Sequence, residues 1–318
     1  MNILVTGAAG FIGSHLCEKL LQNPEHRIIG IDGIIQPRLR TMKERNLGNL
    51  LNNPRFTFIE GNILRISWKS ILPGVEAIYH LAGMPGVRSS WGTDFKLYAN
   101  HNIIATQRLL EACIRKPPER IIFASTSSVY GHKTGRVSEN DSPEPLSPYG
   151  VTKLTGEHLC RVYSENFGVP VVILRFFTVY GPRQREDMAF HRFIRQMLRH
   201  EPLFVNGDGN QTRDFTYVED CIDGTAAALH ASGVIGEIIN IGGKERASVL
   251  EAIAMLEQLS GSRADIRLGG KTLGEPPNTW ADISKAERLL GYCPKVGLSE
   301  GLQLEWNDLC DLYKGGLR

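Results

Sequence analysis

The sequence contains no long apolar segment, no paired cysteines and no excess of one charge. Its longest apolar run, VVILRFF (171–177), is short and includes an arginine, so no membrane span is expected. The six cysteines stand singly, without C-x-x-C or Cys/His spacing, so we expect reduced core thiols and no metal site. The net charge of +2 gives no reason to expect a nucleic-acid partner.

The remaining composition is that of an ordinary soluble enzyme. Hydrophobic residues make up 42% and charged residues 22% of 318 residues, enough for one large or two smaller domains. MNILVTG enters a strand from the first residue, so we expect no targeting segment and a cytoplasmic location.

Short runs rich in Val, Ile and Leu alternate with amphipathic segments through the first half of the chain. Strands that are apolar on both faces, separated by helices, predict a parallel sheet covered on both sides, a doubly wound α/β (Rossmann) fold. The polar stretch from Asp32 to about residue 53 is expected to be irregular. The expected strands are NILVTG, HRIIGID, RFTFIEGN, AIYHLAG, RIIFAST and VPVVILRF, and the expected helices are FIGSHLCEKLLQ, DFKLYANHNIIATQRLLEACI and SPYGVTKLTGEHLCRVYSENFG.

From about residue 178 the pattern loosens, with Gly/Pro turns between shorter helices. We therefore predict a first domain at 1–177 and a smaller α/β domain at 178–318. The segment 214–240 is expected to pack back on the first domain.

VTGAAGFIGSHL places Gly7, Gly10 and Gly13 at the turn from the first strand to the first helix. A pyrophosphate needs close backbone approach and free N–H groups at a helix N-terminus, although tight turns use glycine too. Asp32 ends the second strand 19 residues after Gly13, close to the ~20 expected of an acid that binds ribose hydroxyls and repels a 2′-phosphate. This favours NAD over NADP.

Other residues at the same sheet edge are candidate cofactor contacts. Asn62 and Ile63 follow the third strand, where the adenine is expected. Arg38, Arg40 and Lys43 are read first as solvated loop charges, but Lys43 is kept as a candidate. The full additional set is Phe11, Ile12, Lys43, Asn62, Ile63, Leu81, Ala82, Gly83 and Asn100.

SPYGVTKLTGEH predicts a helix with Ser147 as N-cap, Pro148 at the first position, and Tyr149 and Lys153 four residues apart on one face. The pair is equally compatible with a surface role, because composition alone gives it in roughly a third of such chains. An ammonium ~4 Å from the phenol contributes about 4 kcal/mol at an effective dielectric of ~20. We therefore expect Lys153 to lower the pKa of Tyr149 by about three units, making it a base for an alcohol proton.

FASTSSVYG (123–131) follows a buried strand and carries hydroxyls but no carboxylate. Thr126 ends that strand, where an open parallel sheet binds ligands, and its hydroxyl is expected to relay a proton to Tyr149. A strand-end cap is the alternative role.

With TGAAGFIG, HLAG, ASTSSVYG, YGVTK, LRFFTVYGP and RDFTYVED in this order, the chain resembles the extended short-chain dehydrogenase/reductase family, specifically the nucleotide-sugar epimerases and dehydratases. The resemblance covers essentially the whole chain. It implies tightly held NAD, a UDP- or dTDP-sugar substrate, and a homodimer joined through helices at 94–115 and 148–168.

Within this family, the resemblance implies epimerisation. The 4,6-dehydratases carry an Asp-Glu pair after the threonine, and UDP-glucuronate decarboxylases carry a Glu two residues before the tyrosine of that motif. Ser127 and Ser128 stand at these places here. Neither side chain does acid–base work near neutral pH, so a site of this kind oxidises and reduces C4 but is poorly equipped to eliminate.

LRFFTVYGPRQREDMAFHRF is similar to the UDP-glucuronate 4-epimerase pattern, in Thr178, Arg185 and the Asp187-Met188-Ala189 that follows, and Arg88 suits the same subgroup. The chain departs from it at Arg183-Gln184, where that subgroup often has Trp-Gly. A hexuronate oxidised at C4 is a β-keto acid that readily loses CO₂. Our hypothesis is that hydroxyl donors hold its carboxylate out of the decarboxylating orientation: Thr126, Ser127, Ser128 and Thr178.

The resemblance also implies the nucleotide contacts, each of which has a structural role as its alternative. Arg213 is expected at the diphosphate with Arg185 or Arg192 nearby. Phe204 and Asn206 are expected to bracket the uracil, and Glu275 to meet the uridine ribose. The histidines at 80, 101 and 191 are interpreted as core or surface residues.

We therefore predict a dimeric, NAD-dependent UDP-glucuronate 4-epimerase in which Thr126, Tyr149 and Lys153 are catalytic. The rival enzymes are a UDP-glucose 4-epimerase and a UDP-glucuronate decarboxylase. A non-catalytic NAD-binding sensor is the alternative from another class, although a sensor needs no proton relay.

Overall fold

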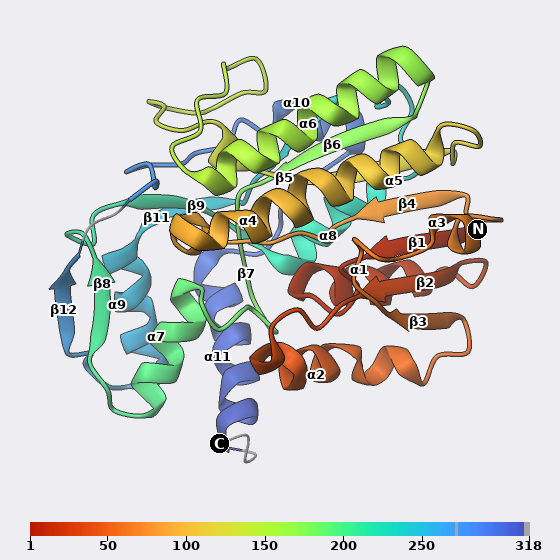
Figure 1. Ribbon diagram of the computed structural model, residues 1–318. Helices are drawn as coiled ribbons and strands as arrows, with labels where there is room; N and C mark the ends of the chain where they lie inside the picture. Colours follow the sequence, from red (N-terminus) through yellow and green to blue (C-terminus); the bar gives the residue numbers. More distant parts are fainter. Residues whose placement is uncertain (271–272, 315–318) are drawn as a thin grey trace.

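The computed structural model describes residues 1–270 and 273–314, and a seven-stranded parallel sheet forms its centre (Figure 1). The strand order is β10-β6-β5-β4-β1-β2-β3, with every neighbouring pair parallel. All six strands expected from the sequence are present, and the doubly wound α/β fold is confirmed. The sheet comprises β1 (Asn2–Thr6), β2 (Arg27–Asp32), β3 (Phe56–Glu60), β4 (Ala77–His80), β5 (Arg120–Thr126), β6 (Val171–Phe176) and β10 (Ile238–Ile241).

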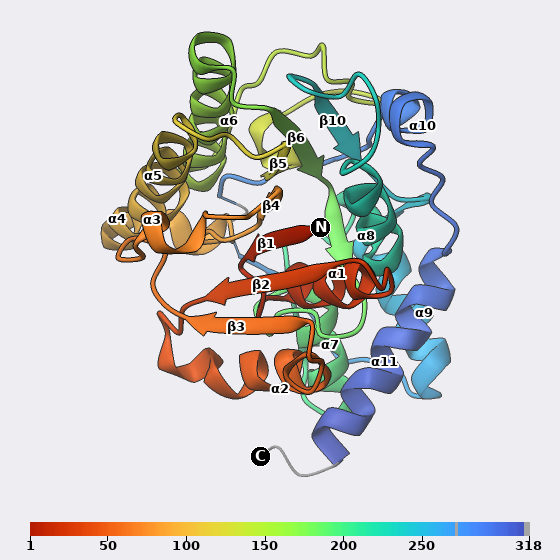
Figure 2. The same cartoon turned by 90° about the vertical axis from the view of Figure 1, so that its right-hand side faces the viewer.

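Helices cover both faces of this sheet, which is why most of its strands are apolar on both sides (Figure 2). One buried cluster joins the sheet to α1, α2, α8 and α10, and a second joins it to α3, α5 and α6. The bounds are α1 (Phe11–Leu21), α2 (Arg40–Leu51), α3 (Trp68–Ile71), α4 (Phe95–Tyr98), α5 (Ala105–Cys113), α6 (Pro148–Phe167), α8 (Val218–Ala227) and α10 (Ser284–Leu290).

Two local expectations need correction. The polar stretch after Asp32 is not irregular throughout, because α2 occupies Arg40–Leu51. Its inner face consists mainly of Asn46, Leu47 and Leu50, too few buried residues to give a clear helical period. The long helix expected at 94–114 is interrupted by a π-helical stretch, η4 (Ala99–Ile104), between α4 and α5.

The rest of the chain forms a smaller α/β unit, seen below and to the left of the sheet in Figure 1. A three-stranded sheet has the order β11-β9-β7, and β12 pairs with β8. The elements are β7 (Thr178–Tyr180), α7 (Ala189–Leu198), β8 (Leu203–Asn206), β9 (Thr212–Tyr217), β11 (Glu245–Ser248), α9 (Val249–Ser260), β12 (Ile266–Gly269) and α11 (Leu298–Lys314). Short 3-10 turns are η1 (Pro37–Leu39), η2 (Arg88–Ser90), η3 (Gly92–Asp94) and η5 (Ser127–Val129).

The middle of the second half returns to the first. Strand β10 pairs with β6 at the edge of the central sheet, and α8 packs against α1. We therefore keep as a proposal the division at 177/178, with 214–240 belonging to the first unit. Residues 271–272 and 315–318 of the proposed second unit lie outside the described residues.

The carboxyl ends of the central strands lie at one edge. Thr6 pairs with Ile31 on one side and His80 on the other, and Thr126 pairs with Phe176. Parallel strands bring these ends together, and the second unit lies beyond them. No helix in the described part of the chain is long and apolar enough to cross a membrane.

Candidate active site

The turn from β1 to α1 is closed by glycines that have no room for a side chain. Gly7 has φ +79°, and a Cβ added to it would lie 2.9 Å from the Ala82 nitrogen. A Cβ on Gly13 would lie 2.1 Å from the Gly7 carbonyl oxygen. Gly10 precedes α1, whose N-terminus has no side-chain cap. Bare backbone followed by uncapped N–H groups fits a dinucleotide pyrophosphate.

Asn46, which sequence reasoning missed, secures this loop from outside. Its amide nitrogen donates to the Ala9 carbonyl (3.0 Å) from α2, and its side chain is buried. No local sequence pattern predicts this hydrogen bond, because it depends on how α2 packs against the loop.

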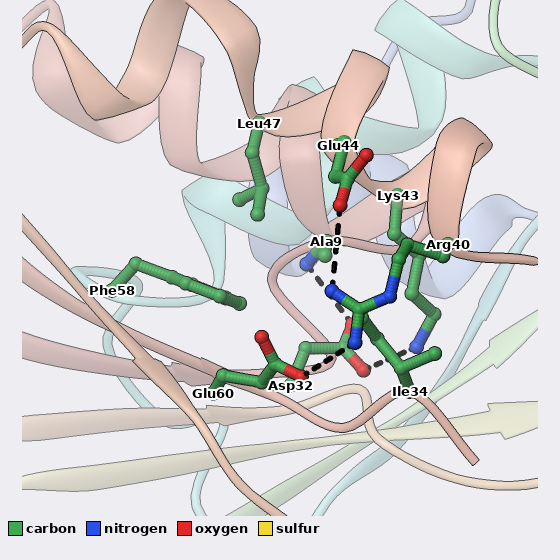
Figure 3. A pocket seen from close by; sticks show the side chains of 9 residues that line it. All are labelled: Ala9, Asp32, Ile34, Arg40, Lys43, Glu44, Leu47, Phe58 and Glu60. Atoms are coloured by element: carbon green, nitrogen blue, oxygen red, sulfur yellow. Dashed lines mark hydrogen bonds and ion pairs between the residues drawn. The ribbon is translucent and has the colours of Figure 1, made fainter. Parts of the chain in front are cut away.

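Asp32 at the end of β2 is held by three donors, of which Ala9 and Lys43 are drawn in Figure 3. Its carboxylate accepts from the Ala9 N–H (3.0 Å), the Gly33 N–H (2.7 Å) and Lys43 Nζ (2.5 Å). Arg40 nearby is paired with Glu44 and Glu60. The cavity beside them holds about 40 Å³ and is lined by Ala9, Asp32, Ile34, Arg40, Lys43, Glu44, Leu47, Phe58 and Glu60.

The remaining cofactor candidates lie along the same edge. Leu81, Ala82 and Gly83 follow β4, and the Ala82 N–H donates to Thr6 Oγ1 (3.2 Å). Asn62 accepts from the Leu64 N–H (2.9 Å), which shapes the turn after β3, and Ile63 is buried. Phe11 and Ile12 open α1, and Asn100 is half-buried on η4.

Asn102, also missed from sequence, braces the stretch after β4. Its Oδ1 accepts from the Met84 N–H (2.7 Å), and its Nδ2 donates to the Met84 carbonyl and to Thr152 Oγ1 (both 3.0 Å). Thr152 lies on α6 between Tyr149 and Lys153. The cofactor edge and the helix with the candidate base are thereby joined.

The candidate base stands in the first turn of α6. As expected, Ser147 caps this helix by accepting from the Gly150 N–H (3.1 Å), and Pro148 is its first residue. Tyr149 faces Thr126 at the end of β5, and its ring meets Tyr98 edge-on at 6.2 Å. The candidate relay and base thus come together from two elements.

The expected effect of Lys153 on Tyr149 is wrong for this structure. Burial raises the pKa of Tyr149 above its ordinary value, and the interaction with Thr126 and the charge of Arg185 oppose this rise only in part. Lys153 Nζ instead lies 4.4 Å from the centre of the Phe123 ring. The ammonium therefore lies over β5 rather than against the phenol, and burial lowers the pKa of Lys153 to about 8.

A buried ion pair lies under this trio. Glu157, one turn beyond Lys153, accepts from Arg175 Nε (3.0 Å) and Nη2 (2.7 Å), and both side chains are almost fully buried. The Ser125 hydroxyl donates to the same carboxylate, which anchors the residue before Thr126. Sequence reasoning missed this network, because its members lie on three separate elements.

The hydroxyl run turns at the strand end. Ser127 and Ser128 lie on η5, where Thr126 Oγ1 accepts from the Ser128 N–H (3.2 Å) and contacts Ser128 Oγ (3.3 Å). Thr178 begins β7, two residues past Phe176, the β6 partner of Thr126. The four hydroxyl residues therefore follow the ends of two neighbouring strands.

A second group of candidates gathers around Glu275. Its carboxylate accepts from Arg88 Nε (2.8 Å) and Arg213 Nη2 (3.2 Å). The Asn206 amide oxygen accepts from both terminal nitrogens of Arg88 (2.5 and 2.9 Å). Beside them a cavity of about 290 Å³ is lined by Gly207, Asp208, Asn210, Gln211, Arg213, Glu275, Pro276, Pro277 and Asn278.

Arg185, Arg192 and Phe204 are the remaining candidate substrate contacts. Arg185 is paired with Asp187 (3.0 and 2.7 Å) while its charge acts on Tyr149. Arg192 donates to the Phe204 carbonyl (3.3 Å), and the positive charge of Arg88 acts on it. The Phe204 side chain is exposed.

The site was also compared with the requirements of a histidine base and of a metal centre. His80 is buried between Thr6 Oγ1 (2.8 Å) and Thr106 Oγ1 (3.1 Å), and burial lowers its pKa to about 3, so the ring is neutral. Within residues 1–270 and 273–314, no cluster of three or more His, Cys, Asp or Glu side chains could hold a metal ion.

Comparisons with known proteins agree with this arrangement. Residues 3–242 match the model of the NAD dependent epimerase/dehydratase family. An uncharacterized UDP-glucose epimerase, YtcB, of Bacillus subtilis (strain 168) is 59% identical over 315 residues, covering 99% of this chain and 100% of that protein. A UDP-glucuronate 4-epimerase of Thermodesulfobacterium geofontis (strain OPF15) is 37% identical over 305 residues, covering 94% and 93%.

Among solved structures, UDP-glucuronic acid 4-epimerase from Bacillus cereus, in complex with UDP-glucuronic acid and NAD, superposes with a TM-score of 0.97. It is 57% identical, and the match covers 98% of this chain and 100% of that one. The resemblance inferred from the motifs is confirmed: the chain belongs to the NAD-dependent epimerase/dehydratase family.

Proposed function

We propose that this protein is a UDP-glucuronate 4-epimerase, interconverting UDP-glucuronate and UDP-galacturonate with bound NAD. One observation carries the proposal. The candidate alcohol-oxidising trio, Thr126, Tyr149 and Lys153, adjoins a strand end that carries Ser127 and Ser128 and no carboxylate. The 57% identity to a UDP-glucuronic acid 4-epimerase over nearly the whole chain supports it.

The residues around the glycine loop would hold NAD. Bound NAD supplies the acceptor for the hydride that leaves C4 and the donor that restores it, so the reaction has no net redox change. Asp32, paired with Lys43, supports NAD over NADP because the carboxylate repels a 2′-phosphate. The proposed contacts are Gly7, Gly10, Phe11, Ile12, Gly13, Asp32, Lys43, Asn62, Ile63, Leu81, Ala82, Gly83, Asn100, Tyr149 and Lys153.

In this proposal Tyr149 accepts the proton of the C4 hydroxyl, directly or through Thr126. Burial raises the pKa of Tyr149, so positive charge nearby is needed for the phenol to give up its own proton. Arg185 supplies some of that charge. Lys153, one turn further along α6, carries a second positive charge, which lies over the Phe123 ring of β5.

Inversion at C4 requires the oxidised sugar to present its other face while its nucleotide stays bound. The Arg88 and Arg213 pair suits a diphosphate anchor, because two guanidiniums match a dianion. Both now pair with Glu275. We propose that the diphosphate displaces this carboxylate toward the uridine ribose, with Arg185, Arg192, Phe204 and Asn206 completing the nucleotide contacts.

The hydroxyls of Thr126, Ser127, Ser128 and Thr178 are proposed to hold the substrate carboxylate away from the decarboxylating orientation. Replacing Ser127 and Ser128 together with alanine should raise the share of pentose by-product made from UDP-glucuronate. Chromatography of the nucleotide sugars measures that share, and an unchanged ratio would remove the role.

A UDP-glucose 4-epimerase is the second candidate, favoured by the name of the Bacillus subtilis relative. NMR of the products from UDP-glucuronate, UDP-glucose and UDP-galactose, side by side, separates the two. We expect UDP-galacturonate from UDP-glucuronate, with little conversion of the neutral sugars. UDP-xylose as the product would instead identify a decarboxylase, and no turnover of any sugar would favour an NAD-binding sensor.

The homodimer is part of the proposal. Apolar side chains stand exposed on the adjoining helical layer of α4, η4, α5 and α6: Phe95, Ile104, Val151, Val162 and Phe167. These helices run side by side across one face of the molecule (Figure 1). A second copy of the same layer would cover these side chains in a four-helix bundle. A cytoplasmic location is proposed with it, and cell fractionation tests that part.

A further inference from the structure

The loop between β7 and α7 contains an arginine in a conformation that favours glycine. Arg183 has φ +66°, and among the described residues only His200 (φ +56°) shares a positive φ without being glycine. A side chain makes this backbone unfavourable, so surrounding contacts must impose it. The Arg183 N–H donates to Asp308 Oδ2 (3.0 Å) on α11, which fixes the turn from one side.

The Arg183 side chain grips the helix that follows the glycine loop. Its guanidinium forks onto Glu18 (Oε1 3.1 Å, Oε2 2.6 Å) and donates to Ser14 Oγ (3.2 Å). It also donates to His15 Nδ1 (3.2 Å). Burial and the charge of Arg183 lower the pKa of His15 to about 4. The neutral ring therefore accepts at Nδ1 and donates from Nε2 to the Pro182 carbonyl (3.0 Å).

The other helix beside the cofactor cavity is tied to the same loop. Asp308 pairs with Arg45 on α2 (2.6 Å), and the next residue, Asn46, donates to Ala9 inside the glycine loop. Residues 182–183 are thus bonded to α1 directly and to α2 through Asp308.

The same loop also carries Arg185, whose charge acts on the candidate base Tyr149. The positive charge of Arg185, two residues on from Arg183, partly opposes the rise that burial causes in the pKa of Tyr149. The loop starts at Gly181, whose N–H donates to the buried Glu305 (2.8 Å). Arg183 therefore joins α1 to the loop that carries Arg185, whose charge acts on the candidate base.

We propose that Arg183 is a positioning residue that locks the Arg185 loop onto α1, so that cofactor retention and substrate binding depend on one contact. The proposal rests on the function above and deepens it. The sequence motif pointed to this position only as a departure from the Trp-Gly of the related pattern. In the structure Arg183 has charged partners in Glu18 and Asp308. These contacts stabilise a backbone conformation that glycine would adopt without strain.

The test compares Arg183→Gly, Arg183→Lys, Glu18→Gln and the Arg183→Gly/Glu18→Gln double variant in NAD-loaded enzyme. His200→Gly is the matched control, since it relaxes the same kind of backbone at an exposed site without touching α1. Two quantities are measured: kcat and KM for UDP-glucuronate, and the rate at which NAD is lost on dilution.

We expect Arg183→Gly and Glu18→Gln each to raise KM and speed NAD loss about tenfold, as the loss of a charge-assisted contact does. Arg183→Lys should change both quantities less than Arg183→Gly does. The double variant should change KM and NAD loss no more than the more severe single variant does. Additive effects, or values equal to His200→Gly, would overturn the proposal. If the wild type leaves UDP-glucuronate unchanged, the proposed function fails, while NAD loss still tests the lock.

Discussion

Glu157 is a carboxylate whose negative charge raises the pKa of Lys153 against the effect of burial. Lys153 is buried, and its ammonium lies over the Phe123 ring. Burial lowers the pKa of Lys153 to about 8, while the negative charge of Glu157 acts in the opposite direction. The positive charge of Lys153 in turn acts on His80 on β4, and Arg175 balances Glu157 from β6.

Replacing Glu157 with glutamine should move the alkaline fall in activity to lower pH. The ammonium of Lys153 is present below its pKa and is lost as pH rises through it, so a lower pKa means an earlier loss. The kcat profile between pH 6 and 10 measures this. Glu165→Gln, two turns further along α6 and exposed, is the matched control and should leave the profile in place.

Breaking a buried pair costs about 3–5 kcal/mol of stability, so the single variant is compared with Glu157→Gln/Arg175→Met, which removes both charges. An alkaline limb at the wild-type pH in both folded variants would contradict this role of Glu157.

At the residue scale, the sequence predicted Tyr149, Lys153, Thr126 and the glycines, because each belongs to a short motif with local spacing. The sequence did not predict Asn46, Asn102 or the Glu157–Arg175 pair, because their hydrogen-bond partners lie 18 to 50 residues away on other elements. The expected lowering of the Tyr149 pKa failed for a related reason. Four-residue spacing gives a shared helix face but not the direction of a long lysine side chain.

At the scale of elements, the β1–α1 turn has no room for a Cβ atom at Gly13. A Cβ at Gly13 would meet the Gly7 carbonyl oxygen at 2.1 Å, and backbone cannot yield as a side chain does. Gly48 in α2 is the opposite case, exposed and with nothing within 4 Å of an added Cβ.

We therefore expect Gly13→Ala to cost about 1–3 kcal/mol and to lower NAD content at least tenfold. Gly48→Ala should gain ~1 kcal/mol from helix propensity and keep its NAD. Thermal unfolding and the NAD released on acid precipitation measure both. NAD content at the wild-type level in Gly13→Ala would show that the loop holds no pyrophosphate.

The strands were predictable from the sequence because doubly buried strands are continuous apolar runs. Helix α2 was not, since its buried face is short and includes a polar Asn46. The π-helical stretch η4 between α4 and α5 also left no trace in the periodicity, because a single such stretch shifts the register by less than a turn.

For the whole molecule, the exposed apolar layer of α4, η4, α5 and α6 predicts self-association. Replacing Val151 and Val162 with lysine should give particles of half the wild-type mass, because the charges would be buried in the proposed interface. Ile235→Lys, at an equally exposed apolar site before β10, should leave the mass unchanged. Light scattering after size-exclusion chromatography measures the masses. A monomeric wild type would exclude the dimer.

The central claim is that the hydrogen at C4 leaves and returns within one closed site. UDP-glucuronate carrying deuterium at C4 tests it most directly, with the UDP-galacturonate formed in ordinary water examined by NMR and mass spectrometry. We predict inverted product that keeps its deuterium at C4. We also predict that Tyr149→Phe forms this product far more slowly than the wild type. Inverted product carrying ordinary hydrogen at C4 would mean exchange with water, and would contradict the account.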